Sequence, residues 1–334
     1  MICNLCPRKC GAVRTAHSGN GFCKMGELPV VARVAPHYGE EPCISGTRGS
    51  GTVFFSGCNL KCVFCQNCQN YEISNEDGGR TITPERLAEC YKELEDKGVH
   101  NINLVTADHF AHAVVKSLEI YKPRIPIVYN CSGYTSPKTL SMLDGLVDIY
   151  LPDFKYADDF LAVKYSSAPN YVNTAVAAIH EMTFQVGLPQ FDDDGIMKKG
   201  VIVRHLILPA HTKNSLEVLD IVKRRFGAQV LLSLMCQYIP MGKVSDKEFS
   251  RLWTLKESYA KMTGEGVGSD LKMKCFDEEN GRTLFESGAV FYHYGTRFNN
   301  EDYYISVCVK TDDKKSADII KKSDFDIDNE HILL

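Results

Sequence analysis

Three cysteines fall within a short stretch that directly follows an apolar run at 53–55. Cys58, Cys62 and Cys65 have the spacing C-x3-C-x2-C. Cysteine thiolates hold iron–sulfur clusters, and a cubane cluster normally takes four of them. Three thiolates on one tight loop would hold three irons and leave the fourth open to bind and break a small molecule, as catalytic zinc keeps an open position. A zinc loop or a chance grouping are the alternatives.

This spacing, with Phe64 directly before the last cysteine, resembles the signature of the radical SAM superfamily. The resemblance implies that the open iron chelates the amino and carboxylate groups of S-adenosylmethionine (SAM), with Phe64 beside the cofactor. It also implies that an electron from the [4Fe-4S] cluster cleaves SAM reductively to a 5′-deoxyadenosyl radical. Cys68 begins a second Cys-Gln-Asn sequence and competes as third ligand, but only Cys65 completes the spacing.

A second group of cysteines lies in the first two dozen residues. Cys3, Cys6, Cys10 and Cys23 are separated by glycines and a proline, which is typical of a loop region without a core of its own. Small modules of this kind usually need a metal or a disulfide. We therefore predict a second metal site, either zinc or another iron–sulfur cluster, because soft thiolates do not discriminate between these metals. Four unligated cysteines remain the alternative.

Length and composition limit the possible classes of protein. The chain has 334 residues, 24% of them charged, with a formal net charge of −4. This length suits one large α/β domain with small additions, and the mild acidity argues against a nucleic-acid binder. An apolar run of membrane-spanning length and an N-terminal signal are both lacking, so we expect a cytoplasmic protein that does not enter a membrane. Fourteen cysteines in such a chain indicate metal sites in a reducing compartment.

Strand-like and helix-like segments alternate after residue 51, which predicts a parallel α/β architecture. A helix is expected from Pro84, after Thr83 as N-cap, to Gly98, and another over 215–226 with Leu216 on its apolar face. Six such units predict the partial (β/α)6 barrel of the radical SAM superfamily, with reactive groups at the carboxyl ends of the strands. The expected strands are 52–56, 101–106, 126–131, 147–152, 201–208 and 230–235.

Three parts of the chain are expected. They are a Cys-rich metal-binding module at 1–50, the barrel at 51–242 and a C-terminal extension of unknown role at 243–334. In the extension, a helix is expected around Phe249 to Tyr259. Two β-rich segments, 288–294 and 303–310, are expected to be joined through Gly295 and Asn299-Asn300.

Residues 1 to about 250 also resemble the pyruvate formate-lyase-activating-enzyme-like branch of the superfamily. The similarity lies in the segment Cys3 to Cys10 and in the strand ends. It implies that Thr106, and after it Asp108, receives the methionine amino group of SAM. Asp153 and Lys155 resemble the Asp-x-Lys motif of activating enzymes, and strand alternation places both on one face, toward the barrel mouth.

The remaining candidates also lie at strand ends. Arg204 sits in an apolar run and needs a partner, either a carboxylate of cofactor or substrate, or Asp153 in an ion pair. Asn130, followed by Ser132, stands where activating enzymes carry an acidic residue, which weakens the expectation of a monovalent-cation site. Gln237 is expected to close the pocket near the adenine. We assign Lys155 and Arg204 as catalytic candidates.

The resemblance implies a radical SAM oxidoreductase that abstracts hydrogen from a protein or peptide. A glycyl radical enzyme is the specific substrate it suggests, and a flavodoxin or ferredoxin-type protein the reductant. The first alternative is radical modification of a peptide or small metabolite, with the N-terminal module as an auxiliary cluster. The second is a non-catalytic iron–sulfur electron-transfer protein, which would not need polar residues at a barrel mouth.

Overall fold

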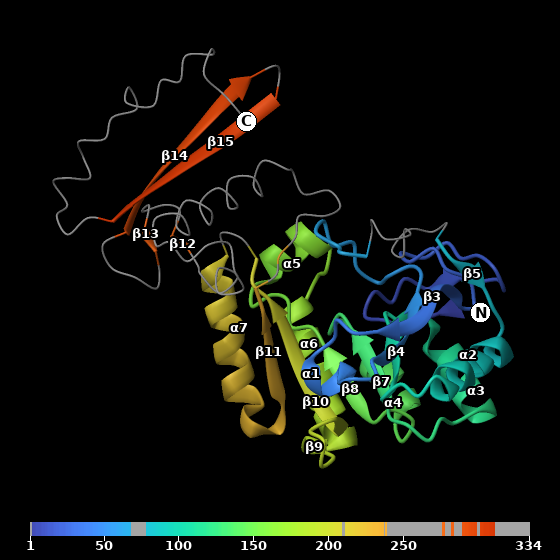
Figure 1. Ribbon diagram of the computed structural model, residues 1–334. Coiled ribbons are helices and arrows are strands. Elements are labelled where there is room, and N and C mark those ends of the chain that lie inside the picture. The colour runs from blue at the N-terminus through green and yellow to red at the C-terminus, as the bar shows by residue number, and fades with distance from the viewer. Residues whose placement is uncertain are drawn as a thin grey trace. The chain divides into compact units, whose positions relative to one another are not determined.

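The computed structural model describes residues 2–67, 78–208, 211–236 and 238, and the strands of the C-terminal part (Figure 1). The chain divides into two compact units, Met1–Val244 and Ser245–Leu334. The N-terminal cysteines belong to the first unit together with the large sheet. The expected separation of a 1–50 module from a 51–242 barrel stays a prediction.

Six parallel strands form the body of the first unit, and each lies beside the next in chain order. This is the arrangement of a partial barrel built from successive strand–helix units, as predicted. All six expected strands are confirmed within a few residues. They are β4 (Ser50–Phe55), β6 (Ile102–Val105), β7 (Ile127–Cys131), β8 (Ile149–Pro152), β10 (Met197–Leu206) and β11 (Leu231–Met235).

Helices connect these strands and cover one face of the sheet. Helix α2 (Pro84–Asp96) begins as predicted, because the Thr83 side chain accepts a hydrogen bond from the Arg86 N–H. In α7 (Thr212–Arg225) the prediction for Leu216 was wrong: it is exposed, and the buried stripe runs through Val218 and Val222 instead. The others are α3 (Ala111–Ile120), α4 (Pro137–Leu143), α5 (Asp159–Ser166) and α6 (Tyr171–Val186), with 3-10 turns η1 (Asp108–Phe110) and η2 (Gly227–Gln229).

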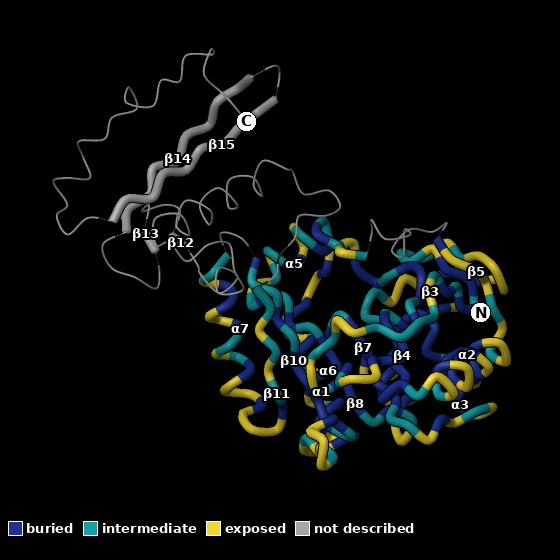
Figure 2. Tube along the Cα trace, viewed as in Figure 1, coloured by how far each residue is buried: buried dark blue, intermediate teal, exposed yellow. Residues whose placement is uncertain are grey.

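The two faces of the sheet pack against different partners. Tyr129 and Tyr150 point into the main core under the helices, whereas their neighbours Val128 and Ile149 pack against Ile44. Ile44 belongs to the short helix α1 (Pro42–Ser45), so this segment covers the inner face of the barrel (Figure 1). Figure 2 shows the sheet as the buried centre of the unit, with exposed residues on the outer sides of the helices. Because side chains alternate along a strand, successive residues of one strand pack on opposite faces of the sheet.

Antiparallel strands extend the sheet beyond β4. Strand β3 (Val30–His37) pairs with β4 and with β5 (Arg80–Thr81), and β9 (Gln190–Phe191) pairs with β10. Near the N-terminus, β1 (Ile2–Cys3) and β2 (Ala12–Val13) form a separate two-stranded sheet.

The second unit contains a four-stranded antiparallel sheet of β12 (Phe276–Asp277), β13 (Arg282–Thr283), β14 (Ala289–Phe298) and β15 (Glu301–Lys310). The β-rich character is confirmed, but Gly295 lies inside β14 opposite Tyr304 and does not form the turn. The helix expected around Phe249 falls outside the described residues. Within the described part of the chain, the helices are too short or too polar to cross a membrane.

Candidate active site

The loop that carries Cys58, Cys62 and Cys65 follows the carboxyl end of β4. Gly57 makes the turn with φ +76°, and a Cβ there would lie 2.6 Å from the Met25 side chain, so other residues are disfavoured. Farther along, the N–H of Val63 donates to the Tyr165 carbonyl at the end of α5, 2.8 Å away. The loop is therefore anchored at both ends to the barrel.

Asn59 fixes the middle of this loop. Its side chain is 1% exposed, and its Nδ2 donates to the carbonyl oxygen of Tyr134 at 2.7 Å. Its own carbonyl oxygen accepts a hydrogen bond from Arg8 Nε at 2.9 Å. Asn59 thus joins the cysteine loop both to the β7–α4 connection and to the N-terminal segment. Sequence reasoning overlooked this residue, although it stands next to Cys58.

The sulfur atoms of the loop have hydrogen-bond donors. Leu60 N–H donates to Cys58 Sγ at 3.3 Å, and Ser166 Oγ donates to Cys62 Sγ at 2.9 Å. Burial raises the pKa of both thiols, and for Cys62 the nearby Lys155 ammonium opposes the rise. Donors and cations of this kind favour thiolates, so the donor set suits a thiolate-bound cluster.

Lys155 connects the cysteine loop to the barrel mouth. Its Nζ lies 2.6 Å from Asp153 Oδ2. Burial disfavours the charged form of Lys155, but Asp153 and Cys62 outweigh this and raise its pKa. The sequence predicted Asp153 and Lys155 on one face, and the structure shows that their side chains also contact each other.

Arg204 uses all three nitrogens of its guanidinium. Nε donates to Asp153 Oδ1 at 3.0 Å, Nη1 to Glu40 Oε2 at 3.1 Å and Nη2 to Asn130 Oδ1 at 2.6 Å. Of the two partners expected from the sequence, the structure shows the ion pair with Asp153. Burial raises the pKa of Asp153, but Arg204 and Lys155 outweigh it, so the pKa falls below its ordinary value.

Glu40 is part of this network and was missed by sequence reasoning. It precedes α1 and reaches across the barrel, where its Oε1 accepts from Asn103 at 3.2 Å and from Asn130 at 3.3 Å. Burial raises its pKa, and Arg204 opposes the rise. Nothing in the local pattern of residues 37–47 reveals a contact with strands more than sixty residues away.

Tyr171 was also missed. Its hydroxyl oxygen accepts the Lys155 N–H at 2.9 Å and lies 2.9 Å from the carbonyl oxygens of Ser132 and Asp153. It joins the ends of β7 and β8 and so fixes the backbone on which Asp153 and Lys155 stand. Such a contact comes from α6, and the sequence carries no signal for it.

Thr106 directly follows β6 and has φ +63°. A β-branched residue in the left-handed region is strained, and such strain persists mainly at functional sites. The Thr106 N–H donates to the Asn130 carbonyl at 2.9 Å, which places it beside the polar network. Asp108 is not part of that network: its Oδ1 accepts from Thr135 Oγ1 at 2.5 Å, and burial raises its pKa to about 6.

The other candidates differ in their surroundings. Ser132 Oγ lies 3.5 Å from Asn59 Oδ1, next to the cysteine loop. Phe64 is buried, with its ring centroid 6.3 Å from that of Tyr238. Gln237 and Cys68 lie outside the described residues.

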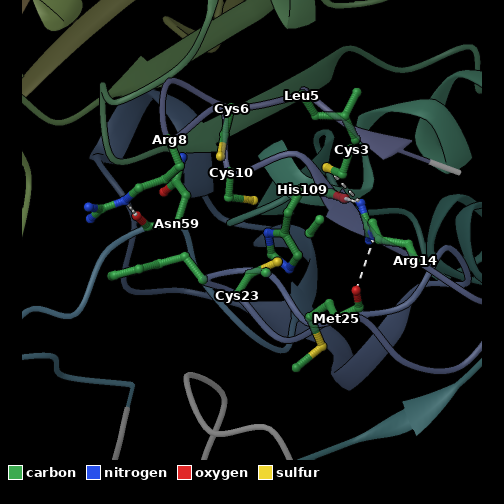
Figure 3. A pocket seen from close by; sticks show the side chains of 13 residues that line it. Cys3, Leu5, Cys6, Arg8, Cys10, Arg14, Cys23, Met25, Asn59 and His109 are labelled. Carbon is green, nitrogen blue, oxygen red and sulfur yellow. Dashed lines mark hydrogen bonds between the residues drawn. The ribbon is translucent and has the colours of Figure 1, made fainter.

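The four N-terminal cysteines line one cavity (Figure 3). Burial raises the pKa of Cys6 to about 12. As the side chains are placed, no three His, Cys, Asp or Glu groups of the described residues converge closely enough to hold a single metal ion. A cubane cluster separates its thiolates more widely, because each binds a different iron.

Comparison with known families decides the relationship. The family model of the radical SAM superfamily matches residues 52–220, half of the chain, from β4 into α7. The chain belongs to the radical SAM superfamily. As such it is an enzyme that uses a [4Fe-4S] cluster and SAM. A second model, of the 4′-phosphopantetheinyl transferase superfamily, matches residues 219–308.

Several known proteins are similar to this radical SAM chain. An uncharacterized protein of Methanocaldococcus jannaschii is 29% identical over 266 residues, which are 76% of this chain and 71% of that protein. The structure of Streptococcus suis SuiB bound to its precursor peptide SuiA is 13% identical with a TM-score of 0.38. The match covers 67% of this chain but 52% of SuiB, so the chain spans about half the length of that protein. Methylornithine synthase is 15% identical with a TM-score of 0.38, over 65% of this chain and 64% of that one.

Proposed function

We propose that Cys58, Cys62 and Cys65 carry the radical SAM cluster and that SAM binds in the barrel mouth beside Lys155, Asp153 and Arg204. The observation that carries this proposal is the position of Lys155: its ammonium lies 2.6 Å from Asp153 Oδ2, and the Cys62 thiol is among the groups that raise its pKa. One side chain thereby links the cysteine loop to the polar groups at the strand ends. The cluster and SAM, when bound, supply a radical able to abstract a hydrogen atom.

The protein's own residues bind and orient the reactants. Lys155 and Arg204 present positive charge to the carboxylate end of SAM, and Asp153 holds both cations in place. Thr106, at the strained end of β6, offers a carbonyl and a hydroxyl to the amino group of SAM. Glu40 and Asn130 accept hydrogen bonds from the two Nη atoms of the guanidinium, so the Arg204 side chain is preorganised.

We further propose a protein or peptide as substrate, with the α-hydrogen of a glycyl radical enzyme as the specific candidate. The support is the resemblance to activating enzymes, together with the open edge of the sheet at β11 in the described order of strands. A partial barrel leaves more room at its mouth for a polypeptide than a closed one. The reductant in this proposal is a flavodoxin or ferredoxin-type protein.

Anaerobic reconstitution with iron and sulfide, followed by dithionite and SAM, tests the chemistry through the mass of released 5′-deoxyadenosine. Single alanine variants of Cys58, Cys62 and Cys65 should abolish its release. Cys90→Ala, a buried cysteine of α2, should release wild-type amounts. If the reconstituted cluster forms and no deoxyadenosine appears, the proposal fails and electron transfer becomes the better reading.

A further inference from the structure

Cys3, Cys6, Cys10 and Cys23 come from three separate segments yet line the same cavity. Cys3 ends β1, which pairs with β2 through the register Cys3↔Ala12. Cys6 and Cys10 flank one turn, and Cys23 lies in another. All four are free thiols. Figure 3 shows their side chains around the imidazole of His109.

Both turns have strained backbone. Lys9 has φ +44° and its N–H donates to the Cys6 carbonyl at 3.1 Å; Lys24 has φ +55° and its N–H donates to Gly21 at 3.0 Å. A left-handed residue other than glycine is strained and persists where its surroundings hold it. Here each strained lysine is the direct neighbour of a cysteine, Cys10 or Cys23. Metal ligation of these cysteines would hold the neighbouring lysines in their strained backbone conformation.

The segment has little core to hold it otherwise. Its own buried cluster consists of Cys3, Leu5 and Ala12, packed against Met142. Among described residues 2–29, the strands are β1 and β2, of two residues each. Short loop-rich segments with so little apolar burial usually depend on a metal or a disulfide. Since the thiols are free, a bound metal is the remaining way to stabilise this segment.

The cavity also holds polar groups that suit an anionic metal centre. Arg14 is 3% exposed; its Nη1 donates to Cys3 Sγ at 3.6 Å and to the His109 carbonyl at 2.7 Å. His109 Nε2 donates to the Ser56 carbonyl at 2.8 Å, so its buried Nδ1 is an acceptor, and it has no hydrogen-bond partner. A buried unsatisfied nitrogen is uncommon and points to a ligand in this cavity.

We propose that Cys3, Cys6, Cys10 and Cys23 hold a four-thiolate metal centre, zinc or an iron–sulfur cluster, separate from the radical SAM cluster. Four thiolates around a zinc ion or around an iron–sulfur core of charge +2 leave a net charge of about −2. Arg14 and Arg8 place two positive charges against it, which reduces the cost of burying that charge. All four cysteine side chains line this one cavity, and a bound centre would fix their rotamers.

Arg8 also connects this centre to the radical SAM loop. Its Nε donates to the Asn59 carbonyl, and its guanidinium lies 3.7 Å over the Phe22 ring, next to Cys23. Burial lowers the pKa of its guanidinium, and the Cys6 and Cys58 thiols oppose that change. Loading of the N-terminal centre is therefore expected to stabilise the segment that supports the catalytic loop. This inference does not depend on which substrate the enzyme uses.

Metal analysis of the full chain tests the proposal. Zinc, iron and acid-labile sulfide are measured per chain in wild type, in Cys6→Ser/Cys23→Ser, in Cys62→Ala and in the control Cys90→Ser. The double variant should lose about one zinc or about four irons relative to wild type, and Cys62→Ala should lose the other centre only. Loss of zinc or of iron distinguishes the two metals, and either supports the proposal. Unchanged metal content in the double variant would overturn it, whether or not deoxyadenosine is released.

A second measurement on the wild type covers the case in which the double variant fails to fold. Folded protein is alkylated with and without a chelator that removes the centre, and labelled cysteines are located by mass spectrometry. Cys10, which is exposed, and Cys6 should be protected before chelation and labelled after it. Equal labelling of Cys10 before and after chelation would contradict a metal centre at this site.

Discussion

Ser166 Oγ lies 2.9 Å from Cys62 Sγ, although 104 residues separate the two in the chain. The serine ends α5, and its hydroxyl also contacts the Tyr156 hydroxyl at 2.6 Å. The sulfur that we assign to the cluster therefore has a fixed donor supplied by a helix.

Replacing Ser166 by Ala should lower the reduction potential of the cluster. The hydroxyl stabilises negative charge on the Cys62 sulfur, and hydrogen bonds to cluster sulfurs raise the potential. The variant should also lose about 1–3 kcal/mol of stability, because the Tyr156 hydroxyl is left without this partner. Redox titration followed by electron paramagnetic resonance measures the potential. The exposed Ser141 of α4, replaced by Ala, is the control, and an equal potential in both variants would contradict the assignment.

Replacing Glu40 by Gln should destabilise the barrel by about 2 kcal/mol. The change keeps the side-chain shape but removes the negative charge that Arg204 faces at 3.1 Å. Asp153 still pairs with Arg204, so the loss of stability stays below the loss that an unpaired buried charge would cause. Urea unfolding gives the free energy. The exposed Glu119→Gln should change it by no more than about 0.5 kcal/mol, and a similar small effect for Glu40 would argue against the network.

Replacing Tyr171 by Phe should loosen the ends of β7 and β8. The Lys155 N–H and the carbonyls of Ser132 and Asp153 lose their shared hydroxyl partner. We expect a stability loss of about 1–3 kcal/mol and about tenfold weaker SAM binding, equivalent to about 1.4 kcal/mol. Calorimetric titration with SAM measures the affinity. The matched change at exposed Tyr38 should leave it unaltered, and unaltered affinity in Tyr171→Phe would place SAM elsewhere.

Asp108 should make the stability of the protein depend on pH. Burial raises its pKa from 3.8 to about 6, so the folded state binds the proton more tightly than the unfolded state and stability falls as pH rises through this window. Asp108→Asn removes that dependence. Between pH 5 and pH 7.5, the free energy of unfolding of the wild type should fall by about 1–2 kcal/mol relative to that of Asp108→Asn. A pH-independent difference between the two proteins would show that Asp108 does not titrate in this range.

The sequence by itself determined the superfamily and the positions of the six barrel strands along the chain. Both are local properties: a thiol spacing within one loop, and apolar runs separated by helices whose limits are marked by residues such as Thr83 and Gly98. The placement of Asp153 and Lys155 on one face was equally accessible, since alternation along a strand fixes which side chains share a face. These signals extend over a few residues, so no long-range information was needed to read them.

Only the tertiary structure decided which distant groups complete the site. Glu40 reaches Arg204 across 164 positions, and the hydroxyls of Ser166 and Tyr171 come from helices that follow β8. The sequence left Arg204 with two alternative partners because a buried guanidinium requires a counter-charge without specifying which one. The packing of Ile44 of α1 on the inner face of the sheet supplied it, since this packing carries Glu40 to the strand ends.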